Sequence, residues 1–470
     1  NSAAPQVVVH AHALHDAGAA LGSLALLADA VGGLDGVALV VLTAGAQEVT
    51  GDEELSPASA ALVGAARVIA QEYPALGCRV VDVTDASEAT AARVAAEAAS
   101  DADDLVVGYR GRHRWVRGFH AANPTTPEAR LREDGAYAFV GALGPHSIAL
   151  AQAVARTRGV RIALITPVEL QVDATRALSQ AGAKVMCIAC DQCDAVALGG
   201  ALDRVEERLG TLQGVVYAPA AGGLAEFGGI AAAEPAAWTA QLATFGADLE
   251  ALAGALGERT PEFVLLEVPL AGAVGGVGQA RLAAAATMAE AAAARHGWTA
   301  VAWDRWNHGG DDPLGIVPDE MPAALDAVLA LAGEPSVLVS TNDLEARIRA
   351  ASTVAPAASG EGGNTLYERP SLDVEYTAPT NEVEEQLAEL WSGLLGIEKV
   401  GIHDDFFGLG GHSLLATQIV ARVRDLFHLD LPLQSIFEAP TISRYALLIE
   451  DAILSELEGL TEEEAAGLMG

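Results

Sequence analysis

The chain has 470 residues, about three domain lengths, and its 51% hydrophobic and 5% aromatic content predicts globular cores built from Ala, Val and Leu, which excludes general disorder. A net charge of −36 with only two lysines argues against binding to the phosphate backbone of a nucleic acid. Four cysteines, no signal peptide and no long uninterrupted apolar run predict a cytoplasmic protein without a membrane span.

Residues 1–130 alternate short apolar runs with helical stretches, which predicts a parallel β/α subdomain. The chain begins at Asn1 without an initiator Met, so we expect it to be part of a longer polypeptide. Strands are predicted at Val7–His10, Gly36–Leu42, Arg79–Val83 and Leu105–Val116, with a helix at Pro57–Tyr73.

Residues 131–350 repeat this alternation more clearly and predict a doubly wound, Rossmann-like sheet. Strands are predicted at Tyr137–Val140, Arg161–Thr166, Val185–Ala189, Gly214–Tyr217, Glu262–Glu267 and Ala300–Trp303. Cys187, Cys190 and Cys193 have a spacing seen in iron–sulfur proteins, but the remaining cysteine, Cys78, is in the other subdomain. Because Cys187 falls within an apolar strand, we expect a small core residue there and no metal site.

A Gly- and Pro-rich segment, residues 351–375, predicts a flexible linker. Residues 376–455 then carry amphipathic helical patterns, the first opened by Asn381 with Glu384 three residues later. The fold class expected is therefore α/β Rossmann-like in two subdomains, followed by a small all-α four-helix carrier bundle. Residues 456–470 are predicted to form an acidic C-terminal tail. Two interpretations of this tail remain: a solvated surface and a docking segment for a partner.

The long loop in the helical region ends in a motif that includes Asp405, Gly410, Gly411, His412, Ser413 and Leu414. Two glycines leave room for a modifying enzyme to approach the Ser413 hydroxyl. A phosphodiester on that serine would also lie at the positive end of the following helix. The simpler alternative is that Ser413 is only a helix N-cap.

The motif and its surroundings resemble the peptidyl carrier (thiolation) domains of nonribosomal peptide synthetases and hybrid polyketide synthases. Tyr376–Thr380 and Ile436–Ile442 match that family on either side of the motif. The resemblance implies that a separate phosphopantetheinyl transferase attaches 4′-phosphopantetheine to Ser413. The implied partners are upstream and trans-acting synthase domains that load and remove a tethered acyl or peptidyl group.

The larger region resembles the ketoreductase domains of modular polyketide and hybrid synthases, which belong to the short-chain dehydrogenase/reductase group. The segments that carry this resemblance are Leu42–Gln47, Leu55–Pro74, Gly135–Leu150, Leu212–Gly223 and Phe263–Trp306. That family uses a tyrosine, a lysine or asparagine and a serine to protonate and hold the substrate oxygen. The corresponding tyrosine, asparagine and serine positions here are Leu282, Ala286 and Val268, and the segment that should hold the lysine has none.

The dinucleotide turn of the family is also altered. Gly141 and Gly144 remain, but Pro145 follows and Ser147 replaces the third glycine. A proline at this point removes an N–H that could face a pyrophosphate. Asp191 matches the family's adenine-side aspartate, yet a lone GxxG after a strand is a weak signal, and NADPH is not expected to bind.

These residues predict an inactive, structural ketoreductase-like region followed by a carrier that holds thioester intermediates. One alternative is an active ketoreductase or epimerase of unconventional mechanism acting on the carrier-bound acyl group. Another is a docking platform for a trans-acting tailoring enzyme. The sequence leaves the acyl group, the natural product and the oligomeric state open.

Overall fold

The computed structural model divides into two compact units, Asn1–Val354 and Ala355–Gly470. It describes the chain except for residues 1–5, 35, 101, 103, 123–130, 168–171, 192–193, 220–229, 231–233, 305–314, 353–375, 396, 398, 405, 407–408, 410–418, 421, 425, 428, 430–434 and 460–470. Within the described part, none of the helices combines the length and the apolar character needed to span a bilayer.

The first sheet of the N-terminal unit has five strands in the order β1-β2-β3-β4-β5. The strands are β1 (Val7–His10), β2 (Ala38–Ala44), β3 (Gly77–Val83), β4 (Val106–Arg110) and β5 (His113–Val116). The first four are parallel, as predicted, but β5 pairs antiparallel with β4. The single strand predicted at Leu105–Val116 is therefore wrong, because Gly111, with φ of 56°, turns the chain into a hairpin.

The second sheet has seven parallel strands in the order β12-β11-β10-β9-β6-β7-β8. They are β6 (Ala136–Gly141), β7 (Arg161–Thr166), β8 (Lys184–Ala189), β9 (Leu212–Ala218), β10 (Phe263–Pro269), β11 (Thr299–Trp303) and β12 (Ser336–Val339). The order reverses between β6 and β9, and ligands of doubly wound folds bind at that point, outside the carboxyl ends of the strands. The prediction of a Rossmann-like sheet is confirmed.

Cys187 does not behave as a core residue, which corrects the expectation drawn from its apolar strand. It lies on β8, an edge strand of the sheet, and its side chain is exposed. Cys193 lies outside the described residues. Within the part of the chain that the structure describes, no group of three or more His, Cys, Asp or Glu side chains could hold a metal ion.

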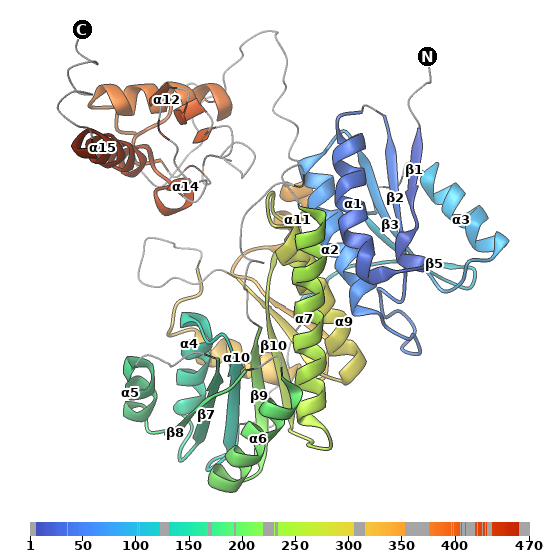
Figure 1. Ribbon diagram of the computed structural model, residues 1–470, viewed down its shortest axis with the longest axis vertical. Coiled ribbons are helices and arrows are strands. Elements are labelled where there is room, and N and C mark those ends of the chain that lie inside the picture. The colour runs from blue at the N-terminus through green and yellow to red at the C-terminus, as the bar shows by residue number, and fades with distance from the viewer. Residues whose placement is uncertain are drawn as a thin grey trace. The chain divides into compact units, whose positions relative to one another are not determined.

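Helices cover both sheets, and some of them lie between the sheets (Figure 1). The N-terminal unit contains the short 3₁₀ helix η1 (His12–Leu14) and the helices α1 (Ala17–Gly32), α2 (Pro57–Glu72), α3 (Glu88–Ala98), α4 (Pro145–Ala155), α5 (Val172–Gln180), α6 (Ala195–Leu209), α7 (Pro235–Leu256), α8 (Ala271–Val274), α9 (Ala280–His296), α10 (Met321–Ala330) and α11 (Leu344–Ser352). One continuous core runs from Leu39 of β2 through α2 and α9 to Ala138 of β6, so the two subdomains share buried packing.

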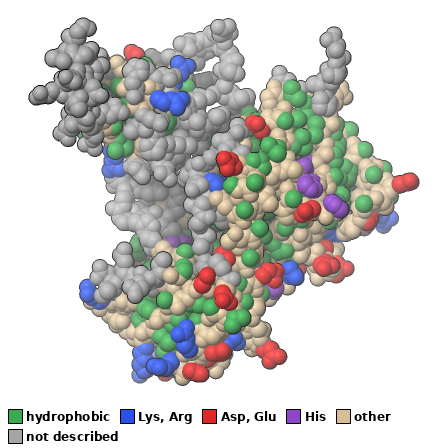
Figure 2. Space-filling model, viewed as in Figure 1, with side chains coloured by type: hydrophobic (Ala, Val, Ile, Leu, Met, Phe, Trp, Pro, Cys, Tyr) green, Lys and Arg blue, Asp and Glu red, His purple; other side chains and the backbone are tan. Residues whose placement is uncertain are grey.

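The predicted linker, residues 351–375, overlaps the last two residues of α11, and its remainder lies outside the described residues. The predicted acidic tail begins within the last helix of the C-terminal unit and then also passes outside them. On the face of the molecule shown in Figure 2, acidic side chains are scattered over the described surface and do not gather in one patch.

The C-terminal unit is helical, as predicted, with α12 (Glu382–Leu395), α14 (Ser435–Glu438), α15 (Ile442–Gly459) and helical residues between 419 and 427. Asn381 caps α12 as expected, because its side chain accepts a hydrogen bond from the Glu384 N–H at 2.8 Å. The Glu384 carboxylate accepts in return from the Thr380 N–H at 2.7 Å. Trp391 and Phe406 meet edge to face at the centre of this core.

Candidate functional site

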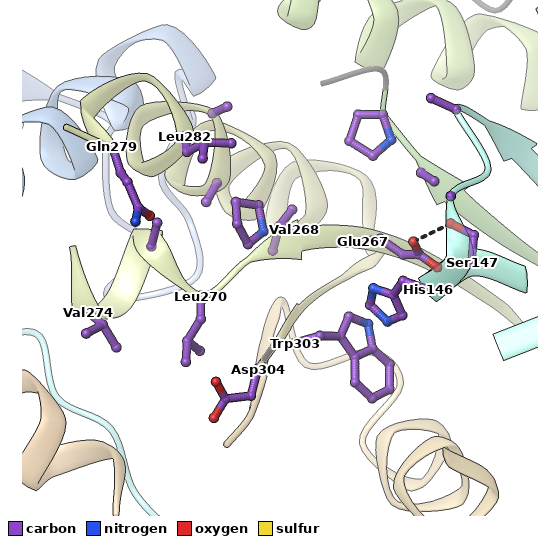
Figure 3. Close-up of a pocket in the computed structure, with 18 of the residues that line it drawn as sticks. His146, Ser147, Glu267, Val268, Leu270, Val274, Gln279, Leu282, Trp303 and Asp304 are labelled. Atoms are coloured by element: carbon purple, nitrogen blue, oxygen red, sulfur yellow. Dashed lines mark hydrogen bonds between the residues drawn. The ribbon is translucent and has the colours of Figure 1, made fainter. Parts of the chain in front are cut away.

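A cavity of about 540 Å³ opens at the carboxyl ends of the central strands of the second sheet (Figure 3). It is bounded by the ends of β6, β9, β10 and β11, together with the start of α4 and one side of α9. This is the point at which the strand order reverses, so the cavity occupies the ligand position typical of the fold.

Ser147 and Glu267 form the polar end of this cavity. Gly144 is the N-cap of α4, which places Ser147 in the first turn of the helix. The Ser147 hydroxyl donates to Glu267 Oε2 at 2.8 Å, whereas Glu267 Oε1 is buried and accepts no hydrogen bond from the described residues (Figure 3). Burial raises the pKa of Glu267 to about 7, and the hydrogen bond from Ser147 opposes that shift.

The structure brings most of the residues singled out by the resemblance to ketoreductases together at this cavity. Val268 of β10 and Leu282 and Ala286 of α9 all line it, as do Gly144 and Ser147. None of the described residues that line it is a tyrosine, lysine or asparagine. The residues within α9 that line the cavity are apolar, and Gln279 at the N-cap of that helix is polar.

Gly141 and Asp191 do not line the cavity. Gly141 ends β6 with φ of 115°, a conformation that glycine adopts without strain. Asp191 follows β8, two strands away from the point where the strand order reverses, and its side chain is exposed. The grouping of Asp191 with the cofactor-site positions therefore remains a prediction from the resemblance alone.

Sequence reasoning missed two further polar residues that line the cavity, His146 and Asp304. The His146 ring packs edge-on against Trp303, with 5.4 Å between ring centroids. Asp304, at the end of β11, accepts from Arg347 Nη1 at 2.5 Å and from the Thr341 N–H at 3.1 Å. The negative charge of Asp304 is thus balanced within the protein, while no described cation pairs with Glu267.

Helix α2 of the first subdomain holds the loop that borders the cavity. Glu72 accepts hydrogen bonds from the backbone N–H groups of Ile230 at 2.7 Å and Gly278 at 2.8 Å. Gln71 donates to the Val274 carbonyl at 2.8 Å and accepts from the Gly276 N–H at 2.7 Å. The first subdomain therefore shapes the cavity without lining it.

The carrier motif lies outside the described residues. The structure does not describe any of the six residues predicted to form it, which are Asp405, Gly410, Gly411, His412, Ser413 and Leu414. The described residues on either side, Leu409 and Ile419, are both buried in the core of the helical unit. The chain before the motif is held by hydrogen bonds from the Phe406 N–H to Pro440 and from the Ser443 N–H to Ile402.

Replacing Glu267 by glutamine tests whether this carboxyl group titrates at an unusual pH. The folded-state pKa is about 7 and the ordinary value is 4.5, so the folded state favours the protonated acid. That stability is fully present below the ordinary value and is lost as the pH rises through 7, by about 3 kcal/mol in total. We therefore expect the difference in free energy of unfolding between wild type and Glu267→Gln to change by that amount between about pH 4 and about pH 8.

Urea unfolding of both proteins at the two pH values measures this difference. The Glu262→Gln protein is the control, because Glu262 precedes the same strand but is partly exposed and ion-paired with Arg132. A pH-independent difference for Glu267→Gln would show that its carboxyl group titrates normally.

Two family models match the chain. Residues 135–307 match the KR domain, and residues 385–449 match the phosphopantetheine attachment site. Among curated proteins, tyrocidine synthase 3 of Brevibacillus parabrevis is 52% identical over 71 residues, which is 15% of this chain and 1% of that protein. Surfactin synthase subunit 3 of Bacillus subtilis (strain 168) is 39% identical over 106 residues, or 22% of this chain and 8% of that protein. The chain thus spans a small fraction of the length of these relatives.

Solved structures share the fold of the N-terminal unit. A structure of A-type ketoreductases from a modular polyketide synthase has a TM-score of 0.63 and 23% identity, covering 71% of this chain and 75% of that one. A multidomain structure with adenylation, ketoreductase and pseudo Asub parts, from a keto acid-selecting nonribosomal peptide synthetase module, has a TM-score of 0.59 and 17% identity, covering 74% and 33%. The chain therefore contains a KR domain, in a unit with the ketoreductase fold, followed by a carrier domain with a phosphopantetheine attachment site.

Proposed function

We propose that the chain carries acyl or peptidyl intermediates on a phosphopantetheine arm at Ser413, next to a KR domain that has no reductase activity. The observation that carries the second half of the proposal is the apolar wall of the cavity. Val268, Leu282 and Ala286 stand at the positions at which the family places its serine, tyrosine and asparagine, and all three line the cavity. A hydrocarbon side chain has no proton to donate to a carbonyl oxygen.

The charge at the start of α4 also argues against a dinucleotide. A helix N-terminus attracts anions, and dinucleotide-binding folds place a pyrophosphate there. Here the Glu267 carboxyl group is hydrogen-bonded to Ser147 in the first turn of that helix. When ionised it repels phosphate at short range, so the residues present do not fit NADPH. The role that remains for the KR domain is to pack against neighbouring synthase domains and to limit the reach of the carrier.

Loading of the carrier is tested by incubating the full chain with a promiscuous phosphopantetheinyl transferase and coenzyme A. We expect the intact mass to increase by one phosphopantetheine group in wild type and in Ser443→Ala, a serine variant of the same domain. Ser413→Ala should show no increase. Loading of Ser413→Ala at the wild-type rate would show that the attachment site is another residue.

The absence of reductase activity is tested on the same loaded protein with NADPH and a 3-ketoacyl group on the arm. We expect no saturable NADPH binding and no NADPH oxidation above that of the Ser413→Ala protein. Turnover would instead identify an active ketoreductase. Exchange of the α-hydrogen of the tethered acyl group with deuterium from solvent, without NADPH, would identify an epimerase.

If the KR domain is instead a docking platform for a trans-acting enzyme, a different result is expected. Capture of a purified trans-acting synthase enzyme by residues 1–354 alone, and loss of that capture when they are deleted, would support docking over packing within the synthase. If a synthase from which only residues 1–350 are deleted forms product at an unchanged rate, both roles, docking and packing, are contradicted.

A further inference from the structure

The cavity beside α4 combines one uncompensated acid with an apolar wall. Glu267 Oε2 is held by Ser147, and the buried Oε1 has no hydrogen-bond donor among the described residues. Buried polar atoms without partners are uncommon in folded proteins, and each calls for an explanation. A hydrogen-bond donor on a ligand would supply the missing partner.

The charges around Glu267 favour a cation over an anion. His146 and Ser147 of α4 lie beside Glu267, and Asp304 at the end of β11 lines the same cavity farther away. The one described arginine at the cavity, Arg347, is already paired with Asp304 at 2.5 Å. No described lysine lines the cavity, so among the described residues a bound anion would meet an acid and find neither a lysine nor an unpaired arginine.

The remainder of the cavity suits a hydrocarbon body. Its apolar lining includes Phe245, Val268, Leu270, Val274, Leu282 and Trp303 (Figure 3). A volume of about 540 Å³ is within the range of sites that take small molecules. Apolar side chains of this kind bind a hydrocarbon group favourably, because the contact removes that group from water.

We propose that this cavity binds a small apolar primary amine in its ammonium form, with the Glu267 carboxylate as the anchor. An ammonium group has three N–H donors, so it can meet Glu267 Oε1 and still donate to a second acceptor. A charge-assisted hydrogen bond of this kind is stronger than a neutral one. The inference does not depend on loading of Ser413 or on the absence of reductase activity.

The direct test is calorimetric titration of the full-length, unloaded chain with leucinamide at about pH 8, where the Glu267 carboxyl group is ionised. Two probes of similar size are titrated alongside: 4-methylpentanamide, which keeps the apolar body without the ammonium, and N-acetyl-leucine, which carries an anion. We expect saturable binding of leucinamide, affinity at least about tenfold weaker for 4-methylpentanamide, and none for N-acetyl-leucine. Equal affinity for leucinamide and 4-methylpentanamide would overturn the proposal, as would the absence of leucinamide binding.

Two variants test whether Glu267 is the residue that binds the ammonium group. Glu267→Gln keeps the shape of the side chain and can still accept from Ser147, but it removes the charge, so leucinamide affinity should fall at least about tenfold. Glu262→Gln, on the partly exposed start of the same strand, should bind as wild type does. Unchanged affinity in Glu267→Gln would assign the ammonium to another group and contradict the proposal.

Proton release supplies a second measurement on the wild-type protein, which is independent of how Glu267→Gln folds. Because the carboxyl group of the free protein is half-protonated near pH 7, binding of a cation there should release about half a proton. Titrations in buffers of different ionisation enthalpy measure this value. Leucinamide affinity should also fall by about tenfold per unit as the pH is lowered below 7. Affinity independent of pH would contradict an anchor at Glu267.

A third experiment distinguishes a free amine from an amine that is carried on the phosphopantetheine arm. Loading Ser413 with a leucyl group presents the same ammonium on the arm, and loading it with a 4-methylpentanoyl group presents the matched body without it. If the carrier-bound amine is the occupant, the leucyl form should weaken binding of free leucinamide and the 4-methylpentanoyl form should not. Equal binding in both forms would identify a free amine as the occupant.

Discussion

Replacement of Arg110 by methionine is expected to lower the free energy of unfolding of the N-terminal unit by about 3–5 kcal/mol. Arg110 ends β4, and its guanidinium contacts Asp82 Oδ2 at 2.8 Å and Glu53 Oε1 at 2.7 Å. The Asp82 side chain is 0% exposed, and its second oxygen accepts from the Thr43 hydroxyl at 2.8 Å and the Ala46 N–H at 3.0 Å. Methionine keeps much of the volume but leaves the Asp82 charge without a counter-ion, which is costly in a buried site.

Urea unfolding of the full chain, followed by tryptophan fluorescence, measures this loss. The matched control is Arg349→Met, because the ion pair of Arg349 with Glu345 is exposed and should cost less than about 0.5 kcal/mol. If the unpaired charge causes the loss, adding Asp82→Asn to Arg110→Met should recover part of it. A loss below about 1 kcal/mol in Arg110→Met would show that water solvates Asp82 and that the network contributes little.

The same network lies at the carboxyl edge of the first sheet. In parallel sheets that edge is the position at which ligands bind. Here the guanidinium of Arg110 lies at the end of β4, and its Nη2 donates to the Gln47 carbonyl at 2.6 Å. No periodicity in the sequence indicates this ion-pair network.

Local patterns predicted several strands with the bounds that they have in the structure. Val7–His10 and Arg161–Thr166 have the predicted bounds, because a continuous apolar run of this length indicates a strand without help from distant residues. The edge strand Ser336–Val339 was missed, since it is short and half-buried. The hairpin within residues 105–116 was missed although Gly111 lies in the polar run Arg110–Arg114, which is a turn signal between two apolar runs.

The candidate site was predictable only in part, for a related reason. Val268, Leu282 and Ala286 could be placed by resemblance, and the structure brings them to one cavity. The raised pKa of Glu267 depends on burial against a helix more than 100 residues earlier in the sequence, and no local pattern encodes that contact. The signal available was a single acid at the end of an otherwise apolar strand. Such an acid is either solvated or functional, and only the fold distinguishes the two.

Replacement of Gly64 by alanine is expected to destabilise the N-terminal unit by about 3 kcal/mol or more. Gly64 lies at the centre of α2, where a Cβ atom would stand 2.0 Å from the Ala283 carbonyl oxygen and 2.3 Å from its carbonyl carbon. Both groups belong to the backbone of α9, so no side-chain rotation relieves the clash. The helices must move apart, which opens a core that is buried along most of both helices.

Gly200→Ala is the matched control, because Gly200 lies within α6, is exposed and has no atom within 4 Å of its missing Cβ. Alanine there should stabilise the protein by about 0.5–1 kcal/mol, since it reduces the freedom of the unfolded chain without a clash. The two glycine variants should therefore shift the urea midpoint in opposite directions. Because α2 also holds the loop at Gly276 and Gly278, Gly64→Ala should weaken leucinamide binding, whereas Gly200→Ala should not. Equal stability of the two variants would mean that α2 and α9 are farther apart in solution than in this structure.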